Sequence, residues 1–388
     1  MTRTRALLAA ALAFGLAAAA LTGCTTTDPD SPLIAISAPG SGDDAWGVGI
    51  AELQKSFQQA GYRVEVRRAG DDIPTQLTQL DELIAKRPDV LVVSPIDGTS
   101  LGNRLDKADA AGVPVVAYDR MAFDTSGVDY FVGFDHELAG RQQAWSLLHG
   151  FGLTDELGQR VPVAPAGPFT VELLAGDLDD SATEPMFDGA LGVLRPYLDA
   201  GTLVIPSGIT ELQFASPTRG EPAGAASRIA GELATGVHLD GILSPDDPMS
   251  LAVIAALPAP QPTPGPTASA TPGASPSATP ASGGDPAVEP ASPILVTGCG
   301  ARPKSIAAIT DGRQLSTLGE DPRTLAEAVA TIVVAIVEGK ESSLDNVAPV
   351  DYFGVSVPTR LLAPVPIDAS YVGAPVEPGH CIRPGLAR

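Results

Sequence analysis

The sequence predicts an α/β protein of two Rossmann-like lobes, each built on a doubly wound parallel sheet with helices on both faces. Short apolar runs alternate with segments of helical period from residue 33 onward, a rhythm typical of βαβ units. The runs are apolar throughout, as strands buried on both faces are. The pattern restarts near residue 130, and 388 residues exceed what one core usually holds, so we expect a second lobe.

The first repeat of this pattern contains four strands and three helices before residue 120. Helical spacing of apolar residues, as in Ile50, Leu53 and Phe57, separates the strands. The strands are expected at 33–36, 63–67, 90–93 and 113–118, and the helices over 50–57, 77–84 and 101–108.

The second repeat is longer and less regular. Its strands are expected at 130–134, 170–174, 203–205, 241–243 and 294–296, with helices around 137–149, 184–198 and 222–235. Two further strand-like runs, 314–318 and 351–357, flank a strongly amphipathic helix over 325–337.

A segment rich in Pro, Thr, Ser, Ala and Gly interrupts the second repeat between residues 258 and 293. It holds eleven prolines among 36 residues, a composition that cannot form a core. We interpret it as a disordered loop inserted between a helix and a strand, since the entropic cost of loop closure grows slowly with length. A simple spacer and an O-glycosylated segment are the alternatives.

The N-terminus predicts export and lipid anchoring. Arg3 and Arg5 precede an apolar run that is too short to span a membrane stably, which is typical of a signal peptide over residues 1–23. The run ends in Leu-Thr-Gly-Cys24, which resembles the lipobox of bacterial lipoproteins, where the cysteine thiol takes a diacylglycerol. An ordinary signal peptide followed by a chance cysteine is the alternative. Residues 24–32 would form a polar tether, and the protein would be extracytoplasmic and anchored to the cell membrane.

The charge excludes several classes of partner. Removing residues 1–23 removes two arginines and no acid, which leaves 22 basic against 46 acidic residues and a net charge of −24. Such a surface repels nucleic acid and anionic lipid, so the lipid itself must provide the anchor. The sequence has no P-loop, HExxH or dinucleotide fingerprint, and its four histidines are scattered. We therefore expect no metal and no cofactor.

Two cysteines remain after Cys24. Cys299 and Cys381 would lie in a compartment where disulfides persist, so they could pair. Two unpaired, buried thiols are the alternative.

One motif suggests an enzyme. Gly98 to Gly102 matches the G-x-S-x-G nucleophile elbow of serine esterases, with Ser100 at its centre. An elbow needs one sharp turn directly after its strand, whereas four residues, 95–98, intervene here. Thr99 or Ser100 is more simply explained as the N-cap of the following helix.

Polar residues cluster where predicted strands end, at 42–46, 118–120, 177–180 and 246–247. In an open α/β sheet, ligands bind beyond the carboxyl ends of the strands, so four clusters from two lobes would converge on one cleft. A carboxylate beside an arginine can accept from one hydroxyl while the arginine donates to its neighbour. Each cluster alone could equally be a solvated turn or a helix cap.

Ordered motifs along most of the chain carry a resemblance. From residue 33 to about 362, apart from the insert, the chain resembles the periplasmic sugar-binding proteins of ABC transporters, in the xylose-binding and multiple-sugar-binding branch. The motifs are Gly-Asp-Asp-Ile-Pro-Thr-Gln-Leu at 70–77, Ser-Pro-Ile-Asp-Gly-Thr at 94–99, Val-Ala-Tyr-Asp-Arg at 116–120, Glu-Leu-Leu-Ala-Gly at 172–176, Asp-Asp at 179–180, Arg-Pro-Tyr at 195–197 with Gly201, and Leu-Ser-Pro at 243–245 with Asp247.

The resemblance implies a type I periplasmic binding protein, whose two lobes are joined by a hinge of three crossings and close on a ligand. It places residues 33–122 and 319–350 in lobe one, and 123–318 and 351–388 in lobe two. It implies a monomer that is not an enzyme and that hands a sugar to an ABC permease.

The residues at the positions of the family's ligand contacts are Asp44, Trp46, Asp119, Arg120, Asp180, Ser181 and Asp247, and Ser181 stands where the family has an asparagine. We expect Asp119 and Arg120 to anchor hydroxyls and Trp46 to stack on the sugar ring. Five positions depart from the family pattern, namely Ala45, Ala182, Gly220, Gly300 and Glu320. These changes make the cleft larger and more negative, which suggests a bulkier or cationic ligand such as an amino sugar.

The first functional hypothesis is therefore a solute-binding lipoprotein of a carbohydrate ABC importer. The second is a protein of the same fold that no longer feeds transport and acts as a sensor or a surface interaction protein, because several sugar contacts are replaced. A serine esterase built on Ser100 is the third.

Overall fold

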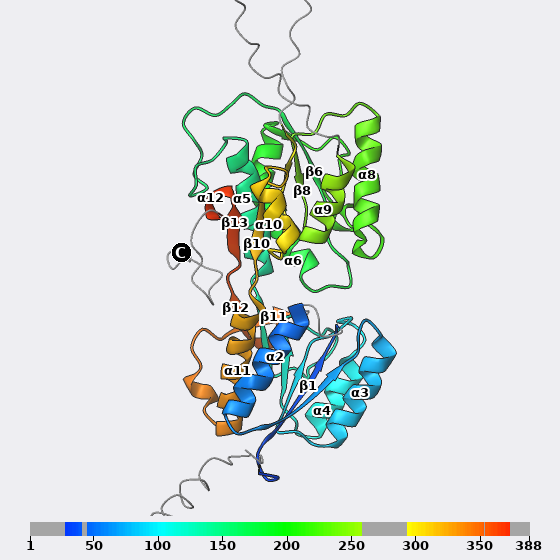
Figure 1. The fold of residues 1–388 in the computed structure, drawn as a ribbon, viewed down its shortest axis with the longest axis vertical. Coiled ribbons are helices and arrows are strands. Elements are labelled where there is room, and N and C mark those ends of the chain that lie inside the picture. The colour runs from blue at the N-terminus through cyan, green and yellow to red at the C-terminus, as the bar shows by residue number, and fades with distance from the viewer. Residues whose placement is uncertain (1–27, 41–44, 258–292, 353, 373–388) are drawn as a thin grey trace, which may run out of the picture.

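The computed structural model describes residues 28–40, 45–257, 293–352 and 354–372. The signal peptide, Cys24, Asp44, almost all of the Pro-rich insert and Cys381 lie outside these residues. Figure 1 shows two lobes placed end to end, each with a central sheet flanked by helices. No helix in the described part of the chain has the length and apolar character needed to cross a membrane.

The first lobe is built on a seven-stranded sheet in the order β11-β12-β5-β4-β3-β1-β2. All neighbouring strands are parallel except β11, which pairs with β12 in antiparallel fashion. The strands are β1 (Leu33–Ala38), β2 (Arg63–Arg68), β3 (Val90–Val93), β4 (Val115–Tyr118), β5 (Tyr130–Phe134), β11 (Ala348–Tyr352) and β12 (Val355–Leu362).

Two pairs of helices cover this sheet (Figure 1). Because side chains alternate along a strand, Ile34 and Ile36 of β1 face one core, while Ala35 faces the other. Helices α2 (Ala45–Gln59) and α11 (Pro322–Glu338) pack on the first core, and α3 (Ile73–Ala85) and α4 (Gly102–Ala110) pack on the second. The alternation of apolar strands and amphipathic helices predicted β1 to β4 and the helices between them.

Helix α11 shows how local sequence sets the ends of an element. Asp321 accepts a hydrogen bond from the backbone N–H of Arg323 at 2.9 Å and so caps the first turn, and Pro322 occupies the first helical position. Gly339 ends the helix in a left-handed conformation with φ of 64°. The helix brings residues from late in the chain back onto the first lobe.

The second lobe has a smaller parallel sheet in the order β7-β6-β8-β9, and an antiparallel pair, β10 with β13. Helices α5 and α6 pack on one face of the sheet, and α8 and α9 pack on the other. The strands are β6 (Phe169–Leu173), β7 (Leu203–Val204), β8 (Gly241–Leu243), β9 (Leu295–Val296), β10 (Ser316–Gly319) and β13 (Val365–Asp368). The helices are α5 (His136–Gly150), α6 (Thr183–Asp199), α7 (Leu212–Ala215), η1 (Thr218–Gly220), α8 (Pro222–Ala234), α9 (Asp247–Ala256), α10 (Pro303–Thr310) and α12 (Ala369–Val372), while the short η2 (Glu341–Ser343) follows α11 in the first lobe.

Helices α5 and α6 cross at very close range. A Cβ atom at Gly140 of α5 would clash with the backbone carbonyl of Met186, and one at Gly189 of α6 would clash with that of Glu137. Glycine at both positions therefore allows the two backbones to touch. This crossing fixes the first turns of α5 and α6, which border the junction of the lobes.

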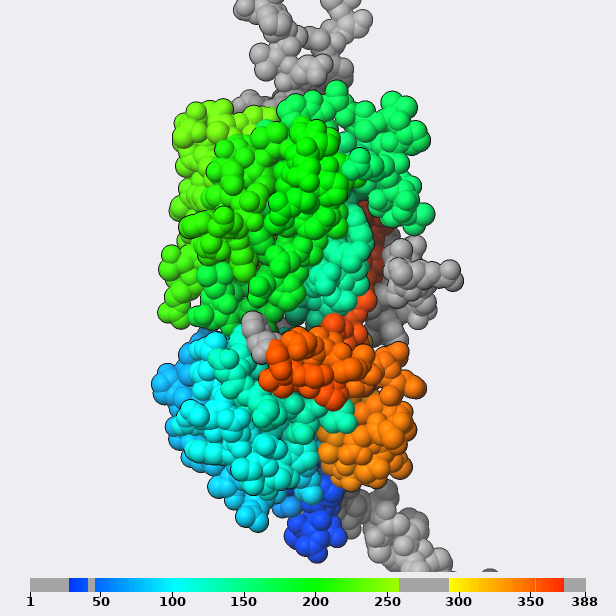
Figure 2. All heavy atoms as spheres, turned by 180° about the vertical axis from the view of Figure 1, so that it is seen from behind, coloured from blue at the N-terminus to red at the C-terminus, as the bar shows by residue number. Residues whose placement is uncertain are grey.

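The chain crosses between the lobes three times, between β5 and α5, between β10 and α11, and between β12 and β13. This arrangement confirms the predicted hinge of three crossings. In Figure 2 the two lobes meet along a waist, and the orange segment around residues 350–360 lies beside it.

Strand pairing corrects two predicted lobe boundaries. We expected residues 123–134 in the second lobe, but β5 pairs with both β4 and β12 and so completes the first sheet. We also expected residues 351–362 in the second lobe and a single strand at 351–357. The segment instead forms parts of β11 and β12, two antiparallel strands of the first sheet around a turn at Gly354. Periodicity predicts a strand but does not identify the sheet that it joins.

Candidate ligand-binding site

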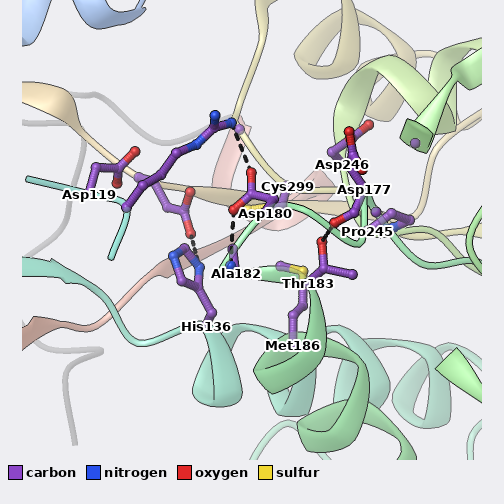
Figure 3. Close-up of a pocket in the computed structure, with 15 residues that line it drawn as sticks. Asp119, His136, Asp177, Asp180, Ala182, Thr183, Met186, Pro245, Asp246 and Cys299 are labelled. Atoms are coloured by element: carbon purple, nitrogen blue, oxygen red, sulfur yellow. Dashed lines mark hydrogen bonds and ion pairs between the residues drawn. The ribbon is translucent and has the colours of Figure 1, made fainter. Parts of the chain in front are cut away.

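A cavity of about 340 Å³ lies between the two lobes. Its walls come from loops that follow the carboxyl ends of β4, β5, β6, β8, β9 and β10, which is where an open α/β sheet binds ligands. Figure 3 shows Asp119 on one side of the cavity, and Asp177 and Asp246 on the other. The full lining is Asp119, Arg120, His136, Gly176, Asp177, Asp180, Ala182, Thr183, Met186, Gly220, Pro245, Asp246, Cys299, Gly300 and Glu320.

An ion pair joins the lobes across this cavity. Arg120 follows β4, and its Nη2 lies 2.8 Å from Oδ2 of Asp180, which follows β6. Arg120 also donates from Nη1 to the carbonyl of Ile96 at 3.3 Å. About a third of the Arg120 side chain and a quarter of the Asp180 side chain remain exposed, so both can still reach a ligand. Both residues, which were predicted as ligand contacts, line this cavity.

The indole ring of Trp46 packs against the guanidinium of Arg120. The Arg120 guanidinium lies 5.7 Å from the centre of the Trp46 ring, and the ring meets Tyr118 edge-on at 5.7 Å. Of the described residues, those that line the cavity do not include Trp46. We expected Trp46 to be the stacking wall; in this structure its ring contacts Arg120, and the stacking role stays a prediction.

Ser181 makes a second contact between the lobes. Its Oγ accepts a hydrogen bond from the backbone N–H of Met121 at 3.2 Å. Asp180 Oδ1 accepts from the backbone N–H of Ala182 at 3.0 Å, which fixes the turn before α6. Ser181 was predicted as a ligand contact, and the structure places it in the closure of the lobes, with Ala182 beside it on the cavity wall.

Asp119 occupies the bottom of the first-lobe wall. Its backbone is left-handed, with φ of 67°, and its N–H donates to the carbonyl of Val132 at 2.8 Å. Burial raises the pKa of its carboxyl, Asp180 acts in the same direction, and the nearby His136 and Arg120 oppose the rise. A hydroxyl or a cation from a ligand would favour the ionised form.

Glu320 and His136 lie opposite each other, on two of the three segments that cross between the lobes. Glu320 Oε1 lies 3.6 Å from Nδ1 of His136 and is buried without a hydrogen-bond partner. Burial raises the pKa of Glu320, and so does the charge of Asp119, whereas His136 and the thiol of Cys299 lower it. Sequence reasoning named Glu320 only as a departure and missed His136. The position of His136 directly after a strand was the available signal.

The two neighbouring acids at 246 and 247 have different surroundings. Asp246 lines the cavity and accepts from the backbone N–H of Met249 at 2.7 Å as the N-cap of α9, while burial raises its pKa. Asp247 is fully buried and accepts from Thr317 Oγ1 at 2.7 Å. Asp247 was predicted to bind ligand, and in this structure the first helical turn directs its side chain into the lobe, away from the cavity lining. The other donors to Asp247 are the backbone N–H of Arg302 at 2.7 Å and Gln314 Nε2 at 3.2 Å.

A search of protein families identifies the fold. The family model described as periplasmic binding protein domain matches residues 34–341. The chain belongs to that family.

Known relatives of this periplasmic binding protein have names that refer to sugars. It is 33% identical to the multiple sugar-binding periplasmic receptor ChvE of Rhizobium radiobacter over 355 residues, which cover 90% of this chain and 91% of the receptor. It is 32% identical to the multiple sugar-binding periplasmic protein SbpA of Azospirillum brasilense, over 94% of this chain and 95% of that protein. An ABC transporter solute binding protein from Clostridium phytofermentans with bound β-D-glucose superimposes with a TM-score of 0.71 at 28% identity, and covers 87% of this chain and 94% of its own.

These comparisons confirm the resemblance and its non-enzymatic character. Within this periplasmic binding protein, Ser100 donates from Oγ to the carbonyl of Asp97 at 3.0 Å, inside its own turn. The loop does not contribute to the cavity described above. The predicted N-cap role is wrong, because α4 begins at Gly102 and its N-cap, Leu101, makes no side-chain hydrogen bond. Asp97 organises the turn instead, accepting from the backbone N–H and from Oγ1 of Thr99.

Cys299 lies buried in the cavity wall of the periplasmic binding protein, and no other described residue forms a disulfide with it. Burial raises its pKa far above the ordinary value, and Glu320 and Asp247 add to the rise, so the thiol stays protonated. Because Cys381 lies outside the described residues, the pairing of the two cysteines stays a prediction.

Proposed function

We propose that this protein is the solute-binding lipoprotein of a carbohydrate ABC importer, and that it binds a sugar in the cavity between its lobes and delivers it to a permease. The observation that carries the proposal is the interlobe cavity, which is bridged by Arg120 and Asp180 in a chain whose relatives are named for sugar binding. An interlobe position couples binding to closure, since a ligand that contacts both lobes stabilises the closed form.

The groups around the cavity suit a polyhydroxylated ligand. Ionised carboxylates accept hydrogen bonds from hydroxyls, and the Arg120 guanidinium donates to their oxygens. Thr183 and Met186, from the first turn of α6, add a small polar and an apolar contact. A ring with several hydroxyls could satisfy groups of both lobes at once.

The lipid anchor would leave this cavity free. The cavity lies beyond the carboxyl ends of the strands, whereas β1 begins with Leu33 at the opposite, amino-terminal end of the strands of the first sheet. A tether of residues 24–32 from lipidated Cys24 would therefore attach the protein by the end away from the ligand. A permease could then engage a monomer through the rims of both lobes.

A thermal-shift panel of pentoses, hexoses and amino sugars tests this proposal. It uses protein that starts at residue 25, which retains every described residue. A ligand at 100 times its Kd stabilises the folded state by about 2.7 kcal/mol, which raises Tm by several degrees. We expect such a rise with at least one sugar and its loss in Asp119→Ala. If no sugar raises Tm in the wild-type protein, the importer function is wrong and a sensor or surface interaction role takes its place.

A further inference from the structure

The cavity has many more acidic than basic groups. Five carboxyl groups line it, against one arginine and one histidine. The arginine, Arg120, is already paired with Asp180. Four further acids face the ligand space, where Arg120 acts on Asp119 and Arg302 acts on Asp246. These acids are Asp119, Asp177, Asp246 and Glu320.

Glu320 is paired only loosely, through an ion-pair contact with His136 and through the Cys299 thiol. Its Oε1 is buried without a hydrogen-bond partner, and the nearest basic nitrogen, Nδ1 of His136, is 3.6 Å away, beyond hydrogen-bonding distance. The Cys299 thiol beside it is a weak donor. A buried carboxylate oxygen without a donor is unfavourable, so this position calls for a strong donor from outside the protein.

Asp119 is a second carboxyl that lines the same cavity. Its charge raises the pKa of Glu320, and the charge of Asp180 raises the pKa of both residues. Two buried acids in electrostatic contact are stabilised in their charged forms by a cation between them. An ammonium group supplies that charge together with three N–H donors.

We propose that the ligand is a sugar bearing a protonated amine, with Glu320 and Asp119 holding the ammonium while the Arg120 and Asp180 pair holds the hydroxyls. This inference rests on the proposed function and specifies its ligand class. The uncharged hydroxyl of an ordinary sugar would leave the cavity with its excess of negative charge. An N-acetylated sugar would bring an amide without a charge to the same place.

Calorimetric titration of the protein from residue 25 tests the inference at pH 7. The probes are D-glucosamine, D-galactosamine and D-mannosamine, each beside its parent hexose and its N-acetyl derivative. We expect at least one hexosamine to bind about tenfold or more tightly than both of its uncharged counterparts. In Glu320→Gln this preference should fall about tenfold, and Asp119→Asn should reproduce the loss.

Glu327→Gln is the matched control, because it makes the same chemical change on the exposed face of α11 and should leave the preference unchanged. Parent hexoses that bind as tightly as the amines overturn the inference and leave the proposed function standing. A preference that survives in Glu320→Gln and Asp119→Asn overturns the assigned anchor. A rise in Tm with calcium chloride alone would overturn it as well, because the cavity would then hold a metal cation. If no sugar of any kind binds, the proposed function fails too.

Discussion

The side chains of Arg120 and Asp180 meet at 2.8 Å across the junction of the lobes, and the next residue of each loop repeats the contact, since Ser181 accepts from the N–H of Met121 at 3.2 Å. Two consecutive residues after β4 therefore pair with two consecutive residues before α6. A ligand in the cavity must therefore either fit beside these contacts or replace them.

Substitution Asp180→Asn should shift the ligand-free protein toward the open form. The ion pair is partly exposed, so its loss should change the free energy of unfolding by less than about 1 kcal/mol. Closure depends on few contacts, and the same loss should therefore change the ratio of closed to open protein severalfold. Small-angle X-ray scattering should show a larger radius of gyration for the variant.

Asp188→Asn provides the control for that measurement, because it removes an exposed carboxylate from α6, the helix that follows Asp180, away from the cavity lining. Its radius of gyration should match that of the wild type. Equal values for Asp180→Asn and Asp188→Asn would show that the ion pair does not control closure.

Trp46 should affect ligand affinity through Arg120. Loss of the indole in Trp46→Ala removes a cation–π contact of about 0.5–1 kcal/mol and an edge contact with Tyr118 of similar size. We expect sugar affinity to fall about tenfold in a binding titration, since about 1.4 kcal/mol corresponds to a factor of ten.

The chain has only one other tryptophan, Trp145, which lies against Arg141 on α5. Trp145→Ala should leave affinity unchanged, and Trp145→Phe leaves Trp46 as the sole indole whose fluorescence reports on the cavity. Unchanged affinity in Trp46→Ala would mean that the contact with Trp46 does not help Arg120 to bind the sugar.

The sequence was sufficient to predict the layers of this fold but not the partners of every strand. Runs such as 90–93 are apolar on both faces, which identifies buried parallel strands whatever follows them. The strand at 130–134 looks the same, yet it belongs to the first sheet because β12, more than 200 residues later, hydrogen-bonds along its other edge. The sequence around 130–134 contains no information about this distant pairing partner.

The residues of the site likewise divide into those that local sequence predicts and those that depend on the three-dimensional arrangement of the chain. Asp119 and Arg120 were predictable because they follow a clear strand. His136 and Glu320 approach each other only because two separate crossings pass side by side, a relationship that depends on three-dimensional topology. Asp246 and Asp247 differ by one residue in sequence, and only the direction of the first turn of α9 decides which one reaches the cavity.

Asp247 should matter for stability rather than for binding. Asp247→Ala leaves buried donors from Thr317, Gln314 and Arg302 without their acceptor, and each such donor costs about 1–3 kcal/mol. The free energy of unfolding should fall by about 2–5 kcal/mol in denaturant titrations. Asp311→Ala, at an exposed ion pair after α10, should change it by less than about 1 kcal/mol. A full loss of stability with Asp311→Ala, or none with Asp247→Ala, would contradict this assignment.

Two glycines in the second lobe should respond to alanine in opposite directions. Gly140→Ala would push α5 away from α6, because the new methyl group meets the Met186 carbonyl, and should cost about 1–3 kcal/mol. Gly192 of α6 faces open space, so Gly192→Ala should stabilise the protein by about 0.5–1 kcal/mol. Thermal unfolding checks both signs, and equal shifts for the two variants would rule out the close crossing as the cause.

The pKa of Glu320 predicts a stability that depends on pH. Burial raises this pKa above the unfolded value of 4.5, and the groups that face the carboxyl are His136, Asp119, Asp180 and Cys299. Protonation is therefore more favourable in the folded protein, so the stabilisation from the proton is fully present below pH 4.5 and is lost as the pH rises through the folded pKa. Above its folded pKa the wild-type Glu320 carries an unfavourable buried charge that Glu320→Gln lacks.

Without ligand, Glu320→Gln should therefore be more stable than the wild type at pH 7, by about 0.5–2 kcal/mol. The difference should shrink as the pH falls toward 4.5, because the wild-type carboxyl then becomes neutral as well. Denaturant titrations of both proteins between pH 4.5 and 7 measure it, with Glu327→Gln as the exposed control that should show no trend. A variant that is less stable than the wild type at pH 7 would mean that His136 already neutralises Glu320, and the cavity would then have no need of a cationic ligand at that point.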